Sequence, residues 1–211
     1  MTDLLVATAN PGKAREIKAL LPTGFNLLTL ADFPEYSPAE ETGDTLAGNA
    51  REKALAASKG TGVLTLAEDS GLEVDALGGA PGVHSARYAG PDQDSRKNIQ
   101  RLLRELEGVP EQERSARFRC VAVLAVSGKL LAEEEGVLEG RIALSPRGVQ
   151  GFGYDPVFIP EGNDRTLAEL TPEEKNRLSH RGRALSRLVP SLERLFSASE
   201  AGTKVAKGAE A

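Results

Sequence analysis

The pattern of apolar and polar positions predicts alternating strands and helices in the first half of the chain. Apolar runs of strand length cover residues 4–9, 25–30 and 63–67. Between them, residues 13–21 place apolar side chains at helical spacing, and a second helix is expected from Asp44 or Thr45 to about residue 59, where Gly60 would end it. Alternation of this kind is typical of α/β proteins, whose helices pack on a sheet.

The middle of the chain adds one amphipathic helix and a β-hairpin. Residues 93–107 repeat apolar side chains with the helical period, namely Ile99, Leu102, Leu103 and Leu106. Residues 117–126 and 129–137 read as two strands joined at Ser127-Gly128. Because a hairpin brings antiparallel strands into the sheet, we expect a mixed β-sheet flanked by helices.

The last third of the chain predicts helices followed by an unstructured end. Thr171 to Glu174 has the form of a capping box with proline at the first helical position, and Ser179 can cap a further helix that Pro190 kinks or ends. From Ser197 the residues are small and polar without period. We therefore expect one domain over residues 1–196 and a disordered tail over 197–211.

Composition limits the classes of protein to which the chain can belong. With 211 residues, 40% hydrophobic and 27% charged, it is expected to be a soluble globular protein. Its one cysteine, Cys120, lies in an apolar run, and no leader sequence precedes the first strand, so a cytoplasmic location and no membrane association are expected. The net charge of −5 argues against a nucleic-acid-binding surface.

Four segments carry side chains suited to chemistry. The first is Thr8-Ala9-Asn10-Pro11-Gly12-Lys13, a strand end, a turn and a helix start. A helix N-terminus with a lysine can bind phosphate, although an ordinary turn with a solvated lysine explains the segment equally well. In the second, Glu40 to Thr45 precedes Asn49 and Lys53, which lie four residues apart and share a helix face.

The third segment, Glu68-Asp69-Ser70-Gly71, follows the apolar run of residues 63–67. Carboxylates where a core strand reaches the surface suit Mg²⁺, which prefers oxygen ligands. A strand that ends in an ordinary turn is the alternative explanation.

The fourth segment, residues 151–156, places Phe152 between two glycines and precedes Lys175, His180 and Arg181. The aromatic ring offers a stacking surface to a flat ligand, and the following cations suit a carbonyl oxygen. A strand edge beside a basic amphipathic helix is the alternative.

Taken together, these motifs resemble the inosine triphosphate pyrophosphatase family. The resemblance covers roughly residues 4–196. It rests on the four segments above, in order, with Gly-Gly-x-Pro-Gly-x-x-Ser-Ala-Arg-Tyr at 78–88, Ala-Glu-Leu at 168–170 and Glu-Lys-x-x-x-Ser-His-Arg-Gly at 174–182. It implies an elongated mixed sheet in two lobes with the active site in the cleft between them. It also implies a homodimer that requires Mg²⁺ and converts dITP, ITP or XTP to the monophosphate and pyrophosphate.

The resemblance also assigns roles to residues. Asp69 would be catalytic and would hold Mg²⁺ together with Glu40, or less favourably Glu41. The substrate would be held by Thr8, Ala9, Asn10, Pro11, Gly12, Lys13, Lys53, Ser70, Phe152, Gly153, Tyr154, Asp155, Lys175, His180 and Arg181. Cationic donors at the base would form hydrogen bonds with a carbonyl at purine position 6, and they would be left unpaired by an amino group there.

Two alternatives stay open at this point. A related pyrophosphatase for modified pyrimidine triphosphates would use the same fold and metal, and a non-catalytic nucleotide sensor would share the binding residues. The sequence leaves the ranking of ITP, dITP and XTP and the exclusion of GTP undetermined.

Overall fold

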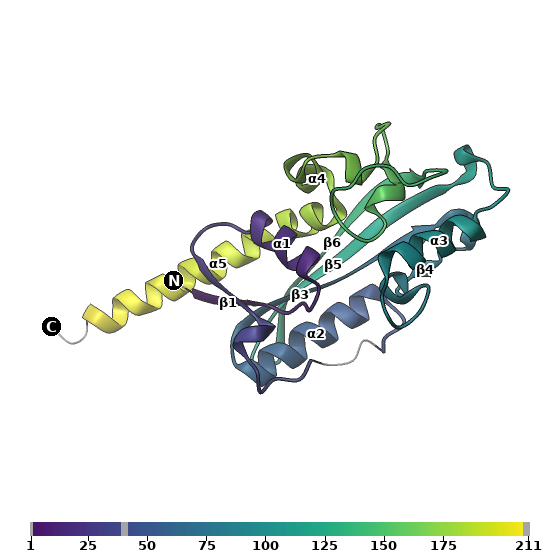
Figure 1. Ribbon diagram of the computed structural model, residues 1–211. Coiled ribbons are helices and arrows are strands. Elements are labelled where there is room, and N and C mark those ends of the chain that lie inside the picture. The colour runs from purple at the N-terminus through teal and green to yellow at the C-terminus, as the bar shows by residue number, and fades with distance from the viewer. Residues whose placement is uncertain (1, 39–41, 209–211) are drawn as a thin grey trace.

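A curved β-sheet with helices on both faces forms the centre of an elongated molecule (Figure 1). The computed structural model describes residues 2–38 and 42–208. Its strands are β1 Thr2–Val6, β2 Phe25–Thr29, β3 Leu64–Val74, β4 Pro81–Gly82, β5 Ser115–Val126, β6 Lys129–Ile142 and β7 Phe158–Pro160. Its α-helices are α1 Pro11–Leu20, α2 Leu46–Thr61, α3 Ser95–Glu105, α4 Pro172–Leu178 and α5 His180–Gly208. Short 3₁₀ helices are η1 Leu30–Asp32, η2 Asp75–Leu77, η3 Ser85–Arg87, η4 Glu111–Glu113, η5 Asp155–Val157 and η6 Leu167–Glu169.

The sheet is mixed, as predicted. Its order is β2-β1-β3-β5-β6-β7, with β4 paired to β3. The pairs β1/β2 and β1/β3 are parallel, whereas β3/β5, β5/β6 and β6/β7 are antiparallel. The predicted hairpin is confirmed: Ser127 and Gly128 join β5 and β6 with φ angles of 50° and 72°. Two positive φ angles in a two-residue loop match the twist of the flanking strands.

Helices cover the two faces of the sheet differently. On one face α1 and α5 pack through apolar side chains such as Ile17 and Leu188 against Leu66 and the buried Cys120. On the other face α2 presents small residues, Ala50, Ala54 and Ala57. Small side chains let the α2 backbone lie close to β3 and β5. A further core, centred on Leu102 of α3, fills the distal end of the sheet.

The strand β3 is longer than the sequence predicted. We expected a strand that ends at Glu68 and Asp69, but β3 continues through both acids to Val74, and residues 69–71 form no turn. Position 71 requires glycine, because a β-carbon there would lie 2.4 Å from the carbonyl oxygen of Gly82 on β4. The neighbouring strand β1 stops instead, at Val6, which pairs with Leu66. This early stop opens space beside residues 68–70.

Three helix boundaries also differ from the prediction. Pro11, not Lys13, begins α1, because Asn10 supplies the N-cap and proline fits the first helical position. Gly62 rather than Gly60 ends α2, since its φ of 74° provides the left-handed cap. Pro190 lies inside α5 without ending it.

The backbone of α5 remains helical to Gly208, where the sequence predicted a disordered tail from residue 197 (Figure 1). Alanine, glutamate and lysine, which favour helix, make up much of this extension, so a helix already formed can continue through it. Its distal part extends away from the sheet (Figure 1).

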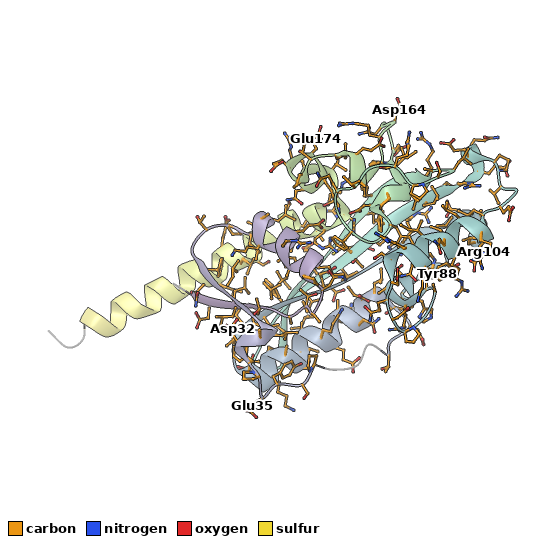
Figure 2. The ribbon with its side chains drawn as sticks, in the orientation of Figure 1. Asp32, Glu35, Tyr88, Arg104, Asp164 and Glu174 are labelled. Carbon is orange, nitrogen blue, oxygen red and sulfur yellow. The ribbon has the colours of Figure 1, made fainter. Side chains whose placement is uncertain are left out.

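The periphery of the molecule is charged. Glu35, Arg104 and Asp164 point outward from different edges (Figure 2). Across residues 2–38 and 42–208, no helix combines the length and apolarity that a membrane span requires.

Candidate active site

A cavity of about 690 Å³ lies where β1 stops and β3 continues. The helices that flank these strands, α1 and α2, lie on opposite faces of the sheet. Such a position at the carboxyl end of parallel strands is a usual ligand site in α/β proteins. All of the predicted site residues in the described part of the chain line this cavity, except Gly12. Glu40 and Glu41 lie outside the described residues.

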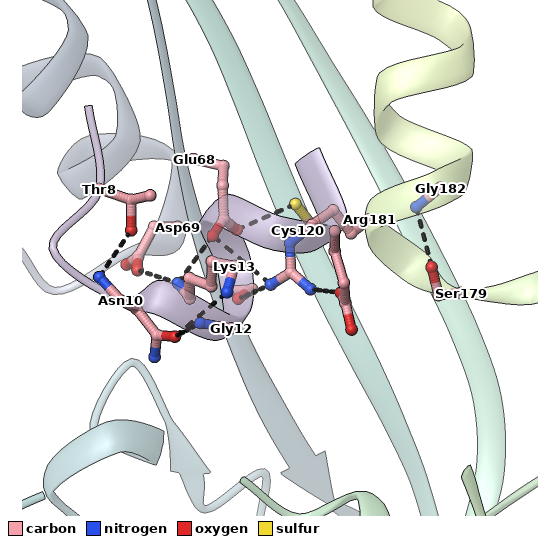
Figure 3. A network of polar contacts seen from close by, with 12 residues as sticks. Thr8, Asn10, Gly12, Lys13, Glu68, Asp69, Cys120, Ser179, Arg181 and Gly182 are labelled. Carbon is pink, nitrogen blue, oxygen red and sulfur yellow. Dashed lines mark hydrogen bonds and ion pairs between the residues drawn. The ribbon is translucent and has the colours of Figure 1, made fainter. Parts of the chain in front are cut away.

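The segment from Thr8 to Lys13 forms one wall and begins α1 (Figure 3). The side-chain oxygen of Asn10 accepts hydrogen bonds from the backbone N–H groups of Gly12 and Lys13, at 2.9 and 3.1 Å. We expected free N–H groups at this helix start. Those of Gly12 and Lys13 are already capped, so the positive end of the helix dipole and the Lys13 ammonium group remain to attract an anion.

Asp69 lies at the junction of β3 and α2. Asn49 Nδ2 donates to its Oδ2 at 3.1 Å, and Lys53 Nζ lies 3.3 Å from its Oδ1. The predicted shared face of Asn49 and Lys53 is therefore confirmed, and it faces the cavity carboxylate. Lys13 Nζ approaches the same carboxylate from the other side, 4.0 Å from Oδ1.

Glu68 points to the opposite face of the sheet from Asp69, because successive strand residues alternate. Its carboxylate is fully buried and contacts Lys13 Nζ at 2.9 Å and Arg181 Nη2 at 3.5 Å (Figure 3). Cys120 donates its S–H to the other carboxylate oxygen, with an S–O distance of 3.2 Å. Burial raises the pKa of Glu68, but the charges of Arg181, Lys13 and Lys53 outweigh it and hold this pKa far below its usual range.

Phe152 also lines the cavity and has two cations near its ring. Lys175 Nζ lies 4.7 Å and Arg181 Cζ 5.7 Å from the ring centroid. Asp155 accepts a hydrogen bond from the Phe152 backbone at 2.7 Å and a second from Lys175. Burial raises the pKa of Asp155 although Lys175 opposes the shift. Gly12 lies behind the ring, where an added β-carbon would be 2.6 Å from Phe152 Cδ1.

His180 begins α5 and lines the cavity with a neutral imidazole. Its ring stacks on Phe118, with centroids 4.7 Å apart and an interplanar angle of 10°. Nδ1 is buried and has no hydrogen-bond partner among the described residues. Burial and the neighbouring Arg181 charge keep the pKa of His180 well below its ordinary value. The imidazole can therefore form a hydrogen bond with a ligand in the cavity.

Sequence reasoning missed Glu16. Its carboxylate lies 2.7 Å from Lys175 Nζ and also pairs with Arg181. The signal was its place three residues after Lys13, on the same face of α1. Glu16 and Glu68 together neutralise cations that the sequence had assigned to the substrate.

The wall formed by η3 was also missed. Tyr154 donates its hydroxyl to the carbonyl of Ser85 at 2.9 Å, and Asn98 Nδ2 donates to the carbonyl of Ala86 at 2.8 Å. Asn98 is buried beside Ile99. A polar residue next to the apolar positions of this helix was the available sequence signal.

The donor chemistry of the cavity suits a hard cation. Asp69 supplies carboxylate oxygen to the cavity, and carboxylate oxygen is the ligand type that Mg²⁺ prefers. Within residues 2–38 and 42–208, no group of three or more His, Cys, Asp or Glu side chains is arranged to hold a metal ion. A Mg²⁺ ion at Asp69 would need further oxygen ligands, for which the sequence predicts Glu40 or Glu41.

Comparison with known proteins gives a consistent result. A family model described as the Ham1 family matches residues 4–191. The dITP/XTP pyrophosphatase of Bacillus subtilis is 47% identical over 92% of this chain and 98% of its own length. That of Geobacillus kaustophilus is 51% identical over 89% of this chain and 93% of its own length. A solved HAM1 protein from Coxiella burnetii superposes with a TM-score of 0.82 at 42% identity, covering 92% of this chain and all of its own.

Proposed function

The chain belongs to the Ham1 family, and on this premise we propose that it is a nucleoside-triphosphate pyrophosphatase acting on dITP, ITP and XTP. It would release the nucleoside monophosphate and pyrophosphate and so remove aberrant purine nucleotides from the pool. The observation that carries the proposal is one cavity lined by two chemically different groups of residues. We assign Asp69 and two lysines to a lysine end, and Phe152 with a neutral His180 to an aromatic end.

The lysine end fits the triphosphate. Lys13 and Lys53 approach Asp69 from opposite faces of the sheet, so their ammonium groups flank the same point. Phosphate oxygens bound there would meet two positive charges and the positive end of α1. Ser70 also lines the cavity, and its hydroxyl accepts a hydrogen bond from Arg181 at 3.1 Å, which places it between the two ends.

The aromatic end fits the base. A purine stacked on Phe152 would present its edge toward His180, Lys175 and Arg181. A carbonyl at purine position 6 accepts hydrogen bonds from such donors, whereas an amino group leaves them unpaired. Asp155 would accept from a ring N–H of hypoxanthine or xanthine.

Hydrolysis requires an activated water at the α-phosphate. Asp69 is the carboxylate placed to orient this water and to take its proton. Asp69, with Glu40 or Glu41, would also hold Mg²⁺. When bound, the metal neutralises charge on the phosphates. Asn49 donates a hydrogen bond to Oδ2 of Asp69, whereas Lys53 contacts Oδ1. When Lys53 binds phosphate, Oδ1 would face the metal or the attacking water.

We further propose two lobes that meet at the cavity, one containing β1, β2 and α2 and the other α3, α4 and the segment 151–160. The family resemblance supports a homodimer, and action on the nucleotide pool supports a cytoplasmic location.

The test is a panel of initial rates. Purified protein is given dITP, ITP, XTP, ATP, GTP and modified pyrimidine triphosphates, with and without Mg²⁺, and the products are identified. We expect monophosphate and pyrophosphate from the first three substrates, with Mg²⁺ required. Release of inorganic phosphate, or a preference for pyrimidines, would contradict the proposal.

A further inference from the structure

Glu68 is the one acid of the Glu68-Asp69 pair that the proposed chemistry leaves without a role. Its side chain is fully buried and does not line the cavity, so it has no route to the substrate. A buried carboxylate is costly unless it is paired and hydrogen-bonded. Its three described partners come from three different elements: Lys13 of α1, Arg181 of α5 and Cys120 of β5.

Figure 3 shows Lys13 and Arg181 reaching the Glu68 carboxylate together. In the proposed function these two cations serve different parts of the substrate, Lys13 the phosphates and Arg181 the base. One carboxylate oxygen, Oε1, contacts both cations, at 2.9 Å and 3.5 Å. Cys120 binds Oε2 and thereby fixes the rotation of the carboxylate. Because β3 is paired with β5 at this position, the backbone of Glu68 belongs to a rigid part of the sheet.

We propose that Glu68 is a positioning residue that sets the separation between the phosphate-binding Lys13 and the base-reading Arg181. It links the affinity for the triphosphate to the selection of the base. The inference rests on the proposed function, whose subsites it connects. Glu16 cannot replace Glu68 in this role, because the described contacts of Glu16 are to Lys175 and Arg181, both at the base end.

A double-mutant cycle tests this role, because residues in contact show coupling whereas independent residues add. Glu68→Gln keeps the shape of the side chain and removes its charge. We expect KM for ITP to rise about tenfold, the scale of a lost charged hydrogen bond, and the kcat/KM ratio of ITP to ATP to fall. In a Lys13→Ala background the KM effect should largely vanish. In an Arg181→Ala background the effect on the ITP/ATP ratio should vanish.

Glu73→Gln is the matched control. Glu73 lies on the same strand and also pairs with two arginines, Arg117 and Arg119, but it is remote from the cavity. It should leave KM and the ITP/ATP ratio unchanged. Additive effects on KM with Lys13→Ala and on the ITP/ATP ratio with Arg181→Ala would overturn the proposal. A carboxylate that serves only the stability of the fold would change the melting temperature without linking KM to Lys13 or the ITP/ATP ratio to Arg181.

A folding failure of Glu68→Gln would be seen by thermal denaturation. The cycle is then run with Glu68→Asp, which keeps the charge but is too short to hold both cations. Coupling is expected there too, and additivity would again overturn the role. The wild-type rates on dITP and ATP are measured in the same series. If the wild-type protein does not prefer dITP, the proposed function fails, whatever the Glu68 variants show.

Discussion

Asp69 is the residue on which the proposed chemistry depends most. Asp69→Asn keeps the shape and the contact with Asn49 but removes the charge that faces Lys13 and Lys53. We expect turnover of dITP to fall at least ~10²-fold, as for the loss of a general base, while the melting temperature changes little. Steady-state kinetics and thermal denaturation check both parts. A near-normal rate with unchanged Mg²⁺ dependence would contradict the assignment.

Arg181 tests base selection. Its guanidinium is almost fully buried and reaches Ser70 and two carboxylates, Glu16 and Glu68. If it also donates to the 6-carbonyl, Arg181→Ala should lower kcat/KM for ITP and XTP by roughly 10- to 100-fold more than for ATP, the equivalent of about 1.5–3 kcal/mol. Equal losses on ITP and ATP would instead place Arg181 at the phosphates or in a purely structural pair.

His180 gives a pH dependence of stability. Its pKa in the folded protein lies well below the ordinary 6.5, so the unfolded chain binds a proton that the folded chain does not. Stability is therefore lost as pH falls below 6.5, by about 1.4 kcal/mol per pH unit from this group. Urea unfolding at pH 7.5, 6.5 and 5.5 should show a smaller loss in His180→Gln than in wild type. An identical loss in both proteins would show that this imidazole is not held neutral.

At the residue scale, motifs in the sequence identified Asp69, Lys13 and Arg181 as members of one site. Their internal partners could not be predicted, because Glu16 and Glu68 become anions of the site only when α1, β3 and α5 meet. A burial pattern along one segment contains no information about a partner that lies 165 residues away, as Arg181 does from Glu16.

At the element scale, the start of α1 packs closely against the segment 151–155. Gly12→Ala would push a methyl group into the ring of Phe152, 2.6 Å from Cδ1. We expect a destabilisation of about 1–3 kcal/mol, typical of overpacking, together with a raised KM. Urea unfolding measures the first effect. Adding Phe152→Ala should relieve much of the stability loss, and a loss that persists in the double variant would contradict the contact.

Local signals determined which elements could be predicted. The hairpin at Ser127-Gly128 and the capping box at Thr171 depend on neighbouring residues, and both were predicted correctly. The length of β3 depends on contacts with other strands. Gly71 looked like part of a turn, but it lies within β3 and packs against β4. Gly60 looked like a helix end, but it lies within α2, where a β-carbon would be 2.7 Å from the ring of Tyr36.

At the scale of the whole molecule, α5 tests how far the domain extends. Leu192 is fully buried and Leu195 packs partly against the same core, so the helix is anchored at least to this point. Truncation after residue 197 keeps both contacts. We expect unchanged kcat/KM and a melting-temperature change below about 2 °C, equivalent to less than about 1 kcal/mol. A larger drop, or a lower dimer content by light scattering, would show that the removed segment docks.

The internal ion pairs have a consequence for how the cavity releases ligands. Without substrate, four cations that line the cavity form ion pairs with carboxylates of the protein: Lys13, Lys53, Lys175 and Arg181. A triphosphate therefore binds by exchange, because its phosphates replace Asp69 as the partner of Lys53 and Lys13. Cleavage divides the charge of the triphosphate between the monophosphate and pyrophosphate. We therefore expect Asp69 to compete for the lysines more effectively after cleavage than before it, which favours the release of both products.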